Sequence, residues 1–500
     1  MPQQCEQNPA QWPSIQETNS VHVAPELLAK MPFFMDYYKT IMAPSMVFVD
    51  GPHNPFRDHI LRLAAGSQSL QHAICALSAC NLRMKRRLSL GLGTREMADK
   101  LMAEKAVGDS PSDTAVDDQS LSEEYQHRNI AVHLLNQQLN DPTKAAHDSV
   151  LATILLLCHY RTAESGIAKF HTQFAGVRKI LAMRQAQHVA PSRETAWMES
   201  IFTYFDSISA TINDRDTQLG AGGRDSHLLP PGAENLVGCE RGLFRIISKL
   251  PRLNLLSQHR QSNPSQGYFA GANNIHTYKP DVAGLQTPEL LDLYNIHSQR
   301  FDGNGFMGSP LGDDEIPTPV ASGATFWQEW KEIRQALQNW EFDAMRLQST
   351  LPCDPSPSQL RDLGCLSEAF RYAALLYTER LAAPASPSSS ANFQNLVSQV
   401  VYYATSLEVS SAAEKFLLWP LFVAGSECVN DLQRNIVRSK CRDIMGRSGY
   451  MNNLAALDIL ENLWSGEIEG GKGMGPVKTA PFNWMKYIGG VGGEVEWIMF

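Results

Sequence analysis

The sequence has 500 residues, and its 43 Lys and Arg against 52 Asp and Glu give a formal net charge of −9. A chain of this charge repels a phosphate backbone on average, which disfavours a free-standing nucleic-acid-binding domain. With 43% hydrophobic and 19% charged residues, the composition is that of a globular protein and excludes the disordered, collagenous and disulfide-rich classes.

The longest apolar runs, residues 150–158 and 416–424, are about half of the ~20 residues that a membrane-spanning helix needs. The first residues, MPQQCEQNPAQWPS, lack the cationic and apolar regions of a secretory signal. We therefore expect an intracellular protein with no membrane partner.

The sequence contains nine cysteines, an odd number. The closest pair, Cys75 and Cys80, lacks the Cys-x-x-Cys spacing that gives a tetrahedral zinc ion two ligands from one turn. Most of the cysteines lie in apolar helical patterns. The sequence therefore predicts buried free thiols, no metal and no cofactor.

Apolar residues recur at intervals of three, four and seven through most of the chain. Between about 69 and 86 they line one face of a predicted helix, and the same test predicts further helices over residues 201–208, 366–381, 396–407 and 454–464. There is no series of alternating strands, so we predict an all-α fold.

One helix is expected to lie at the centre of this fold. Residues 150–158 are apolar almost all round, which is typical of a helix packed on every side. Asp148 or Ser149 is its predicted N-cap.

Polar or Gly/Pro-rich stretches interrupt the helical pattern. We predict loop insertions at about 106–122, 213–234, 251–285, 301–322 and 384–391. The first has four Asp and no Lys or Arg, which predicts a disordered acidic insertion, and the last is a Ser/Pro tract that predicts a flexible tether.

The predicted organisation is a single large irregular helical body with long loops. Helical segments on both sides of the loops are similar in composition, which favours one body over several domains. We place an N-terminal tail at 1–25, the body at 26–465 and a Gly-rich apolar C-terminal tail at 466–500.

Three blocks of sequence share the pattern of a known family. NPFRDHILRLAAGSQSLQHAICALSACNLRMKRR (54–87) resembles the opening of the regulatory domain of fungal-specific transcription factors. Residues 125–139 followed by 149–181 are similar to that family's helix pair, which runs into a short His-to-Gly segment, here His171 to Gly176. Residues 416–437 and 457–464 resemble its WPLF-x-AG helix and its helix ending in Trp.

The resemblance implies a transcription regulator in the nucleus, controlling RNA polymerase II genes, with a metabolic or secondary-metabolite pathway as one candidate setting. In that family a helical effector domain follows a binuclear zinc cluster in which six cysteines hold two zinc ions and place a helix at the major groove. Here only Cys5 precedes Cys75. We therefore expect DNA contact only through a module absent from this chain: either the gene product lacks the cluster, or a first exon is missing from the sequence.

No catalytic set can be assembled from the sequence. The string Gly303-Asn-Gly-Phe-Met-Gly308 matches G-x-G-x-x-G, but it lacks the flanking strand and helix of a dinucleotide site and is interpreted as a Gly-rich turn. Cys158 and His159 point about 100° apart on a helix, which argues against a nucleophile and base. Histidines 127, 133, 147, 159 and 171 are interpreted as core or rim residues.

A short basic run offers a weak nuclear-import hypothesis. It comprises Arg83, Lys85, Arg86 and Arg87. Cations that complement a helix C-terminus explain the run equally well.

The dipeptide Trp419-Pro420 interrupts a helical pattern and predicts a kink with an apolar gap beside it. A gap between packed helices is a typical place for a small apolar ligand. The residues predicted to line this pocket are Phe416, Trp419, Phe422, Trp464 and Trp497.

The C-terminal tail has an apolar end, which includes Trp497, behind four glycines at Gly489, Gly490, Gly492 and Gly493. One hypothesis is that these glycines form a hinge and that the tail is a lid over the gap. The alternative is a static core plug, which is the commoner role of buried aromatic residues.

Three functions therefore stay open. The first is a nuclear regulator with a helical, ligand-responsive effector domain, whose partners are other regulators or co-regulators. The second is an enzyme on the same scaffold. The third is an interaction partner without DNA binding that pairs through exposed helix faces, as a homodimer or with relatives.

Overall fold

The computed structural model describes residues 23–89, 119–186, 195–219, 229–262, 300–303, 323–465, 484 and 496–498. Helices dominate these residues, and the one sheet among them is an antiparallel pair of two-residue strands, β1 and β2. The all-α prediction is confirmed. The elements of the N-terminal part are α1 (Pro25–Tyr37), the π-helix η1 (Tyr38–Met42), α2 (Ala43–Ser45), α3 (Pro55–Ala64), α4 (Gln68–Ser89), α6 (Gln119–Leu139) and α7 (Asp148–Glu164).

The middle and C-terminal parts continue the helical pattern. The middle contains β1 (Ile167–Ala168), α8 (Phe170–Ala186), α9 (Ala196–Ile212), α10 (Glu234–Val237), α11 (Arg241–Ile247) and α12 (Leu250–Ser262). The C-terminal part contains α14 (Gly323–Asn339), α15 (Ala344–Thr350), α16 (Pro357–Ala382), α17 (Ala391–Thr405), the 3₁₀ helix η5 (Ala412–Phe416), α18 (Leu418–Ser426), α19 (Asp431–Ser448), α20 (Asn452–Ser465) and β2 (Glu496–Trp497).

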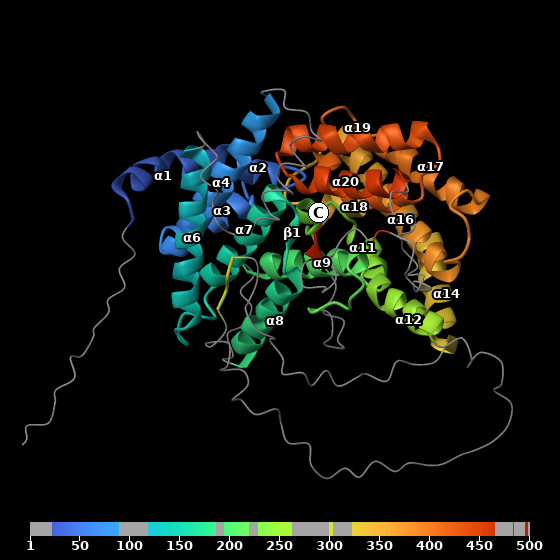
Figure 1. Ribbon diagram of the computed structural model, residues 1–500, viewed down its shortest axis with the longest axis horizontal. Coiled ribbons are helices and arrows are strands. Elements are labelled where there is room, and N and C mark those ends of the chain that lie inside the picture. The colour runs from blue at the N-terminus through green and yellow to red at the C-terminus, as the bar shows by residue number, and fades with distance from the viewer. Residues whose placement is uncertain are drawn as a thin grey trace, which may run out of the picture.

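Two groups of helices flank a central group (Figure 1). On one side α4 packs against α1, α6 and α7, and on the other α16, α17, α18, α19 and α20 pack against one another. The two sides meet where α19 contacts α4 and α20 contacts α7, while α9 contacts α7 and β2 from the middle. One large apolar core runs through all three groups.

The helix predicted at residues 150–158 is enclosed along nearly its whole length. It is α7, and every residue from Ser149 to Glu164 is buried. Its N-cap is His147, whose ring accepts a hydrogen bond from the Ser149 backbone N–H at 3.2 Å, so the expected caps Asp148 and Ser149 lie one and two positions inside the helix. The helices expected near 69–86, 201–208, 366–381 and 454–464 are α4, α9, α16 and α20.

Several predicted loop boundaries are wrong. Residues 251–262 form helix α12, because Pro251 lies in the first turn, where no backbone donor is lost, and Leu253 and Leu256 are buried. Helix α6 already begins at Gln119, inside the expected insertion 106–122; residues 106–118 lie outside the described part of the chain.

Other predicted loops are held against the body by buried contacts. The tract 384–391 ends where α17 begins, and Arg380 donates to the main-chain oxygen of Ser386 at 2.6 Å, so it is anchored and not a free tether. At the start of the stretch 301–322, Phe301 is buried and its carbonyl accepts from Asn136 at 2.7 Å. The polar composition of these stretches does not predict such contacts, because the partners lie outside the stretch in the chain.

Helix α19 offers an isolated test of local stability. Asn430 is its N-cap, and the Asn430 side chain accepts a hydrogen bond from the Gln433 backbone N–H at 2.8 Å. We expect Asn430→Ala to lower the free energy of unfolding by about 0.5–2 kcal/mol, because one helix donor loses its partner. Asn430→Asp keeps the acceptor and should stay close to wild type in the same denaturant titration; equal losses in both variants would contradict the capping role.

Candidate functional site

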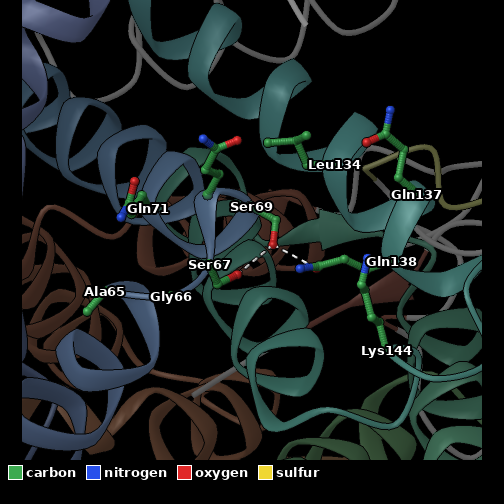
Figure 2. Close-up of a pocket in the computed structure, with 10 residues that line it drawn as sticks. Ala65, Gly66, Ser67, Ser69, Gln71, Leu134, Gln137, Gln138 and Lys144 are labelled. Carbon is green, nitrogen blue, oxygen red and sulfur yellow. Dashed lines mark hydrogen bonds between the residues drawn. The ribbon is translucent and has the colours of Figure 1, made fainter. Parts of the chain in front are cut away.

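One cavity in the described part of the chain has a mainly polar lining. It encloses about 610 Å³ between the start of α4 and the end of α6. Figure 2 shows Ser69 between Ser67 and Gln138. The Ser69 Oγ lies 3.0 Å from the Ser67 Oγ and donates to the Gln138 Oε1 at 2.8 Å. These side chains satisfy one another, and the cavity presents no nucleophile with a base. The lining residues are Ala65, Gly66, Ser67, Gln68, Ser69, Gln71, Leu134, Gln137, Gln138 and Lys144.

Another cavity, of about 260 Å³, lies where remote parts of the sequence meet. We call it the interhelical cavity. Its walls come from α2, α3, α7, α9, α10, η5, α19 and α20, so it contacts the N-terminal, middle and C-terminal helix groups. The lining residues are Pro44, Ser45, Met46, Phe56, His159, Ile201, Tyr204, Phe205, Leu236, Val237, Ser410, Ser411, Ala412, Glu414, Lys415, Phe416, Ile444, Arg447, Ser448, Tyr450 and Asn453.

Aromatic rings dominate one wall of the interhelical cavity. His159 lies edge-on to Phe56 and Phe205, with ring centroids 5.6 and 5.5 Å apart. Burial lowers the pKa of His159 to about 3, so its imidazole is neutral at physiological pH. This wall is therefore suited to contact with an apolar ligand, since small-molecule sites usually have an apolar lining.

A few polar groups interrupt this apolar lining. Tyr450 Oη and Asn453 Oδ1 are buried and make no hydrogen bond within the described part of the chain. Lys415 Nζ donates to the main-chain oxygen of Ser45 at 2.6 Å and to that of Val47. Burial lowers the pKa of Lys415 to about 7, with the nearby Asp50 acting in the opposite direction. An apolar cavity with a few convergent polar groups is the common form of a ligand site.

Phe416 lines the cavity, and its ring packs directly against Gly238. Gly238 ends α10 at φ = +66°, a conformation that glycine adopts without strain, and a Cβ there would overlap the Phe416 ring. Helix α10 and η5 are thereby brought together, although residues 238 and 416 are remote in the sequence.

The structure does not bring the five predicted pocket residues to one cavity. Phe416 lines the interhelical cavity, whereas Trp419 and Phe422 are core side chains: Trp419 stacks on Phe370 and donates to Thr211, and Phe422 packs on Trp484. Trp464 is half-buried, and its Nε1–H donates to the Gly425 carbonyl.

The sequence predicts a helix kink at Pro420, but in the structure Pro420 does not interrupt a helix. Pro420 lies in the first turn of α18, directly after η5, so its missing N–H interrupts no helical hydrogen bond. A break between two helices, and not a bend in one, lies beside the cavity. Sequence periodicity does not distinguish these arrangements, because both end a helical pattern at the same proline.

The C-terminal segment packs into the middle of the molecule. Trp497 is in β2 and pairs antiparallel with Ile167 in β1, and its main-chain N–H and C=O bond to the Asn213 side chain at 2.9 and 2.7 Å. Trp497 is 2% exposed and does not line the interhelical cavity. The four hinge glycines, 489, 490, 492 and 493, lie outside the described residues.

The basic run near the end of α4 is partly buried. Arg83 is 3% exposed and forms a bidentate ion pair with Glu124, at 2.7 and 2.8 Å, so it is unavailable to an import receptor. Lys85 is half-buried and Arg86 is exposed, while the side chain of Arg87 lies outside the described set. The import hypothesis is therefore left with Lys85, Arg86 and Arg87.

The histidines and cysteines have structural partners. His127 contacts His72, with 2.9 Å between the Nδ1 atoms, and burial lowers the pKa of His127 to about 3. Cys158 contacts Gln173 Oε1 at 2.7 Å, and burial raises the pKa of its thiol, which removes it as a nucleophile. Within the described ranges no three His, Cys, Asp or Glu residues lie close enough together to hold a metal ion.

The helices of the described chain include none with the length and hydropathy of a membrane span. Searches of curated proteins and of solved structures gave no significant match. The family model for the fungal specific transcription factor domain, by contrast, matches residues 33–492, which is most of the chain and takes in all three helix groups around the interhelical cavity. The chain therefore belongs to the fungal specific transcription factor domain family.

Proposed function

We propose that this chain is the ligand-responsive effector domain of a fungal transcription regulator and that the interhelical cavity binds a small apolar molecule. The domain acts in the nucleus on RNA polymerase II genes, together with other regulators or co-regulators. Contact with DNA comes from a module outside this sequence. A metabolic or secondary-metabolite pathway is the setting that suits a small-molecule effector.

The observation that carries this proposal is the position of the cavity. A ligand there contacts α3 and α7 on one side, α9 and α10 in the middle, and η5, α19 and α20 on the other side. A ligand shifts a conformational equilibrium only through contacts that differ between two states, and a site shared by three packed groups supplies such contacts when the groups move relative to one another. The effector thereby changes the surface that the domain presents to co-regulators.

Ala412 provides a substitution that fills the cavity with little risk to the core. It lies in η5, lines the cavity and is exposed to solvent. We expect Ala412→Trp to weaken binding of 1-octanol, used as the apolar test ligand, at least tenfold, because the indole occupies the ligand volume. Binding is measured on the full chain by isothermal titration calorimetry and by the ligand-dependent rise in melting temperature.

Ala391→Trp is the matched control, since Ala391 is also exposed but lies at the start of α17 and does not line the cavity. The full chain fused to a heterologous DNA-binding module supplies a cellular reporter assay. In this assay the reporter output of Ala412→Trp should not change when 1-octanol is added, whereas that of Ala391→Trp should change as in the wild type. Identical behaviour of the two variants would refute the cavity as the effector site.

A further inference from the structure

Lys415 is a cation in the wall of the interhelical cavity without a carboxylate partner among the described residues. Its Nζ donates to the carbonyl oxygens of Ser45 and Val47, which are neutral acceptors, and lies 5.1 Å from the centre of the Phe416 ring. Ser45 and Phe416 also line the cavity. The ammonium group is thus held beside the apolar space and is not neutralised there.

Two carboxylates near Lys415, Asp50 and its chain neighbour Glu414, are already used by other cations. Glu414 forms ion pairs with Lys440, at 2.7 Å, and with Arg447. Asp50 forms an ion pair with Arg57 at 3.1 Å. A cation that is partly removed from water gains most from an anion that it contacts directly. A negatively charged ligand group in contact with Lys415 would therefore stabilise its ammonium group.

We propose that the interhelical cavity binds an apolar monocarboxylic acid, with the carboxylate against Lys415 Nζ and the hydrocarbon body against the wall formed by Phe56, Ile201 and Phe205. This inference rests on the proposed function and names the chemical class of its ligand. Tyr450 Oη and Asn453 Oδ1, the buried atoms without a hydrogen-bond partner in the described chain, are placed for a second polar group or a water molecule.

The volume of the cavity limits the size of the acid. The volume of the cavity is about 260 Å³. It holds roughly nine non-hydrogen atoms if each occupies ~30 Å³, the volume of one water molecule in the liquid. A straight-chain acid of eight carbons is close to this size. Longer acids would have to extend past the exposed residue Ala412 into solvent.

Binding of a carboxylate to Lys415 should depend on pH. Burial lowers the pKa of Lys415 to about 7, whereas a carboxylate in contact stabilises the charged form and raises this pKa. Below pH 7 the lysine is already protonated. Above pH 7 each binding event must take up a proton, so the affinity for the acid falls by up to tenfold per pH unit.

Other charged and titratable groups lie around Lys415. Asp50, in the segment before α3, interacts with it electrostatically. The cavity is also lined by Glu414 on η5, His159 on α7, Tyr204 on α9, Arg447 on α19 and Tyr450, and Lys440 on α19 pairs with Glu414. His159 is neutral, since its pKa is lowered to about 3, and burial raises the pKa of Tyr450. Asp50, Glu414, Lys440 and Arg447 are in ion pairs. The pKa of Lys415, at about 7, lies between pH 6.5 and 8.5.

The test compares octanoate with 1-octanol, which has the same chain length and no charge, by calorimetry on the full chain. At about pH 6.5 we expect octanoate to bind at least tenfold more tightly. Between about pH 6.5 and 8.5 its affinity should fall by about 25-fold, which follows from a lysine pKa near 7, while the affinity of 1-octanol stays constant.

Lys415→Met keeps an unbranched apolar side chain, one atom shorter than lysine, and removes the charge. It should abolish both the preference for octanoate and the pH dependence while leaving 1-octanol binding intact, which also shows that the variant is folded. Lys331→Met removes the same charge from an exposed position on α14, outside the cavity, and should behave as wild type.

The outcomes separate this inference from the proposed function. Equal binding of octanoate and 1-octanol, or an octanoate preference that survives Lys415→Met, would overturn the assignment of an acid and leave the cavity as a site for neutral apolar ligands. Failure of both compounds to bind the wild type would overturn both proposals.

Discussion

Glu124→Gln is expected to destabilise the protein by about 3–5 kcal/mol, because it leaves the Arg83 guanidinium buried without its counter-charge. Glu124 is fully buried, accepts two hydrogen bonds from Arg83 and accepts a third from Tyr160 Oη at 2.9 Å. These contacts join α4, α6 and α7 at the centre of one helix group. Urea denaturation followed by circular dichroism measures the change.

An exposed ion pair supplies the control for this prediction. Arg438 and Glu461 have the same bidentate geometry, with distances of 2.6 and 2.7 Å, but their side chains are 24% and 36% exposed. Solvent screens such a pair, so Glu461→Gln should cost only about 0–1 kcal/mol. Similar losses in Glu124→Gln and Glu461→Gln would show that burial of the first pair does not determine its contribution.

The second large effect is expected at Trp497, where substitution by alanine should lower the free energy of unfolding by about 3–5 kcal/mol. Its ring is buried, and its backbone is held by Asn213 and by pairing with Ile167. Next to it, Glu496 accepts a charge-assisted hydrogen bond from Arg215 at 2.7 Å. These contacts favour the static plug over the hinged lid, because a lid should separate easily from the body.

Equilibrium unfolding and the reporter assay together distinguish plug from lid. Tyr402→Ala serves as the control, since Tyr402 is 62% exposed on α17 and its loss should change stability by no more than about 0.5 kcal/mol. A Trp497→Ala protein with wild-type stability and constitutive reporter output would reject the plug and support the lid. Loss of stability without ligand-blind output supports the plug.

The local pattern of the sequence predicted the elements that depend on local periodicity. The apolar stripe of α4, the all-round apolar run of α7 and the faces of α9, α16 and α20 each place buried residues at helical spacing. Errors occurred where the spacing is ambiguous. Helix α12 has a low apolar content and a proline at its second residue, so it was interpreted as a loop, although the proline costs no backbone hydrogen bond in the first turn.

The candidate site was predicted only in part. Of the five residues in the predicted pocket, Phe416 lines the interhelical cavity, and the break before Pro420 lies near it. Lys415 was missed, because its importance comes from Ser45 and Val47, which are remote in the chain, and from the carboxylates that other cations occupy. A lysine next to an apolar run is a weak signal that could have directed attention to it.

The amino-acid sequence by itself determined that this protein is an all-α body of the fungal transcription factor type, since helical periodicity and family pattern are properties of contiguous residues. Only the tertiary structure decided that Arg83 is a buried ion-pair partner, that Trp497 belongs to the core and that the cavity contains a lysine without a carboxylate partner among the described residues. Burial and pairing of charges depend on contacts between residues far apart in the chain, and a one-dimensional pattern does not encode those distances.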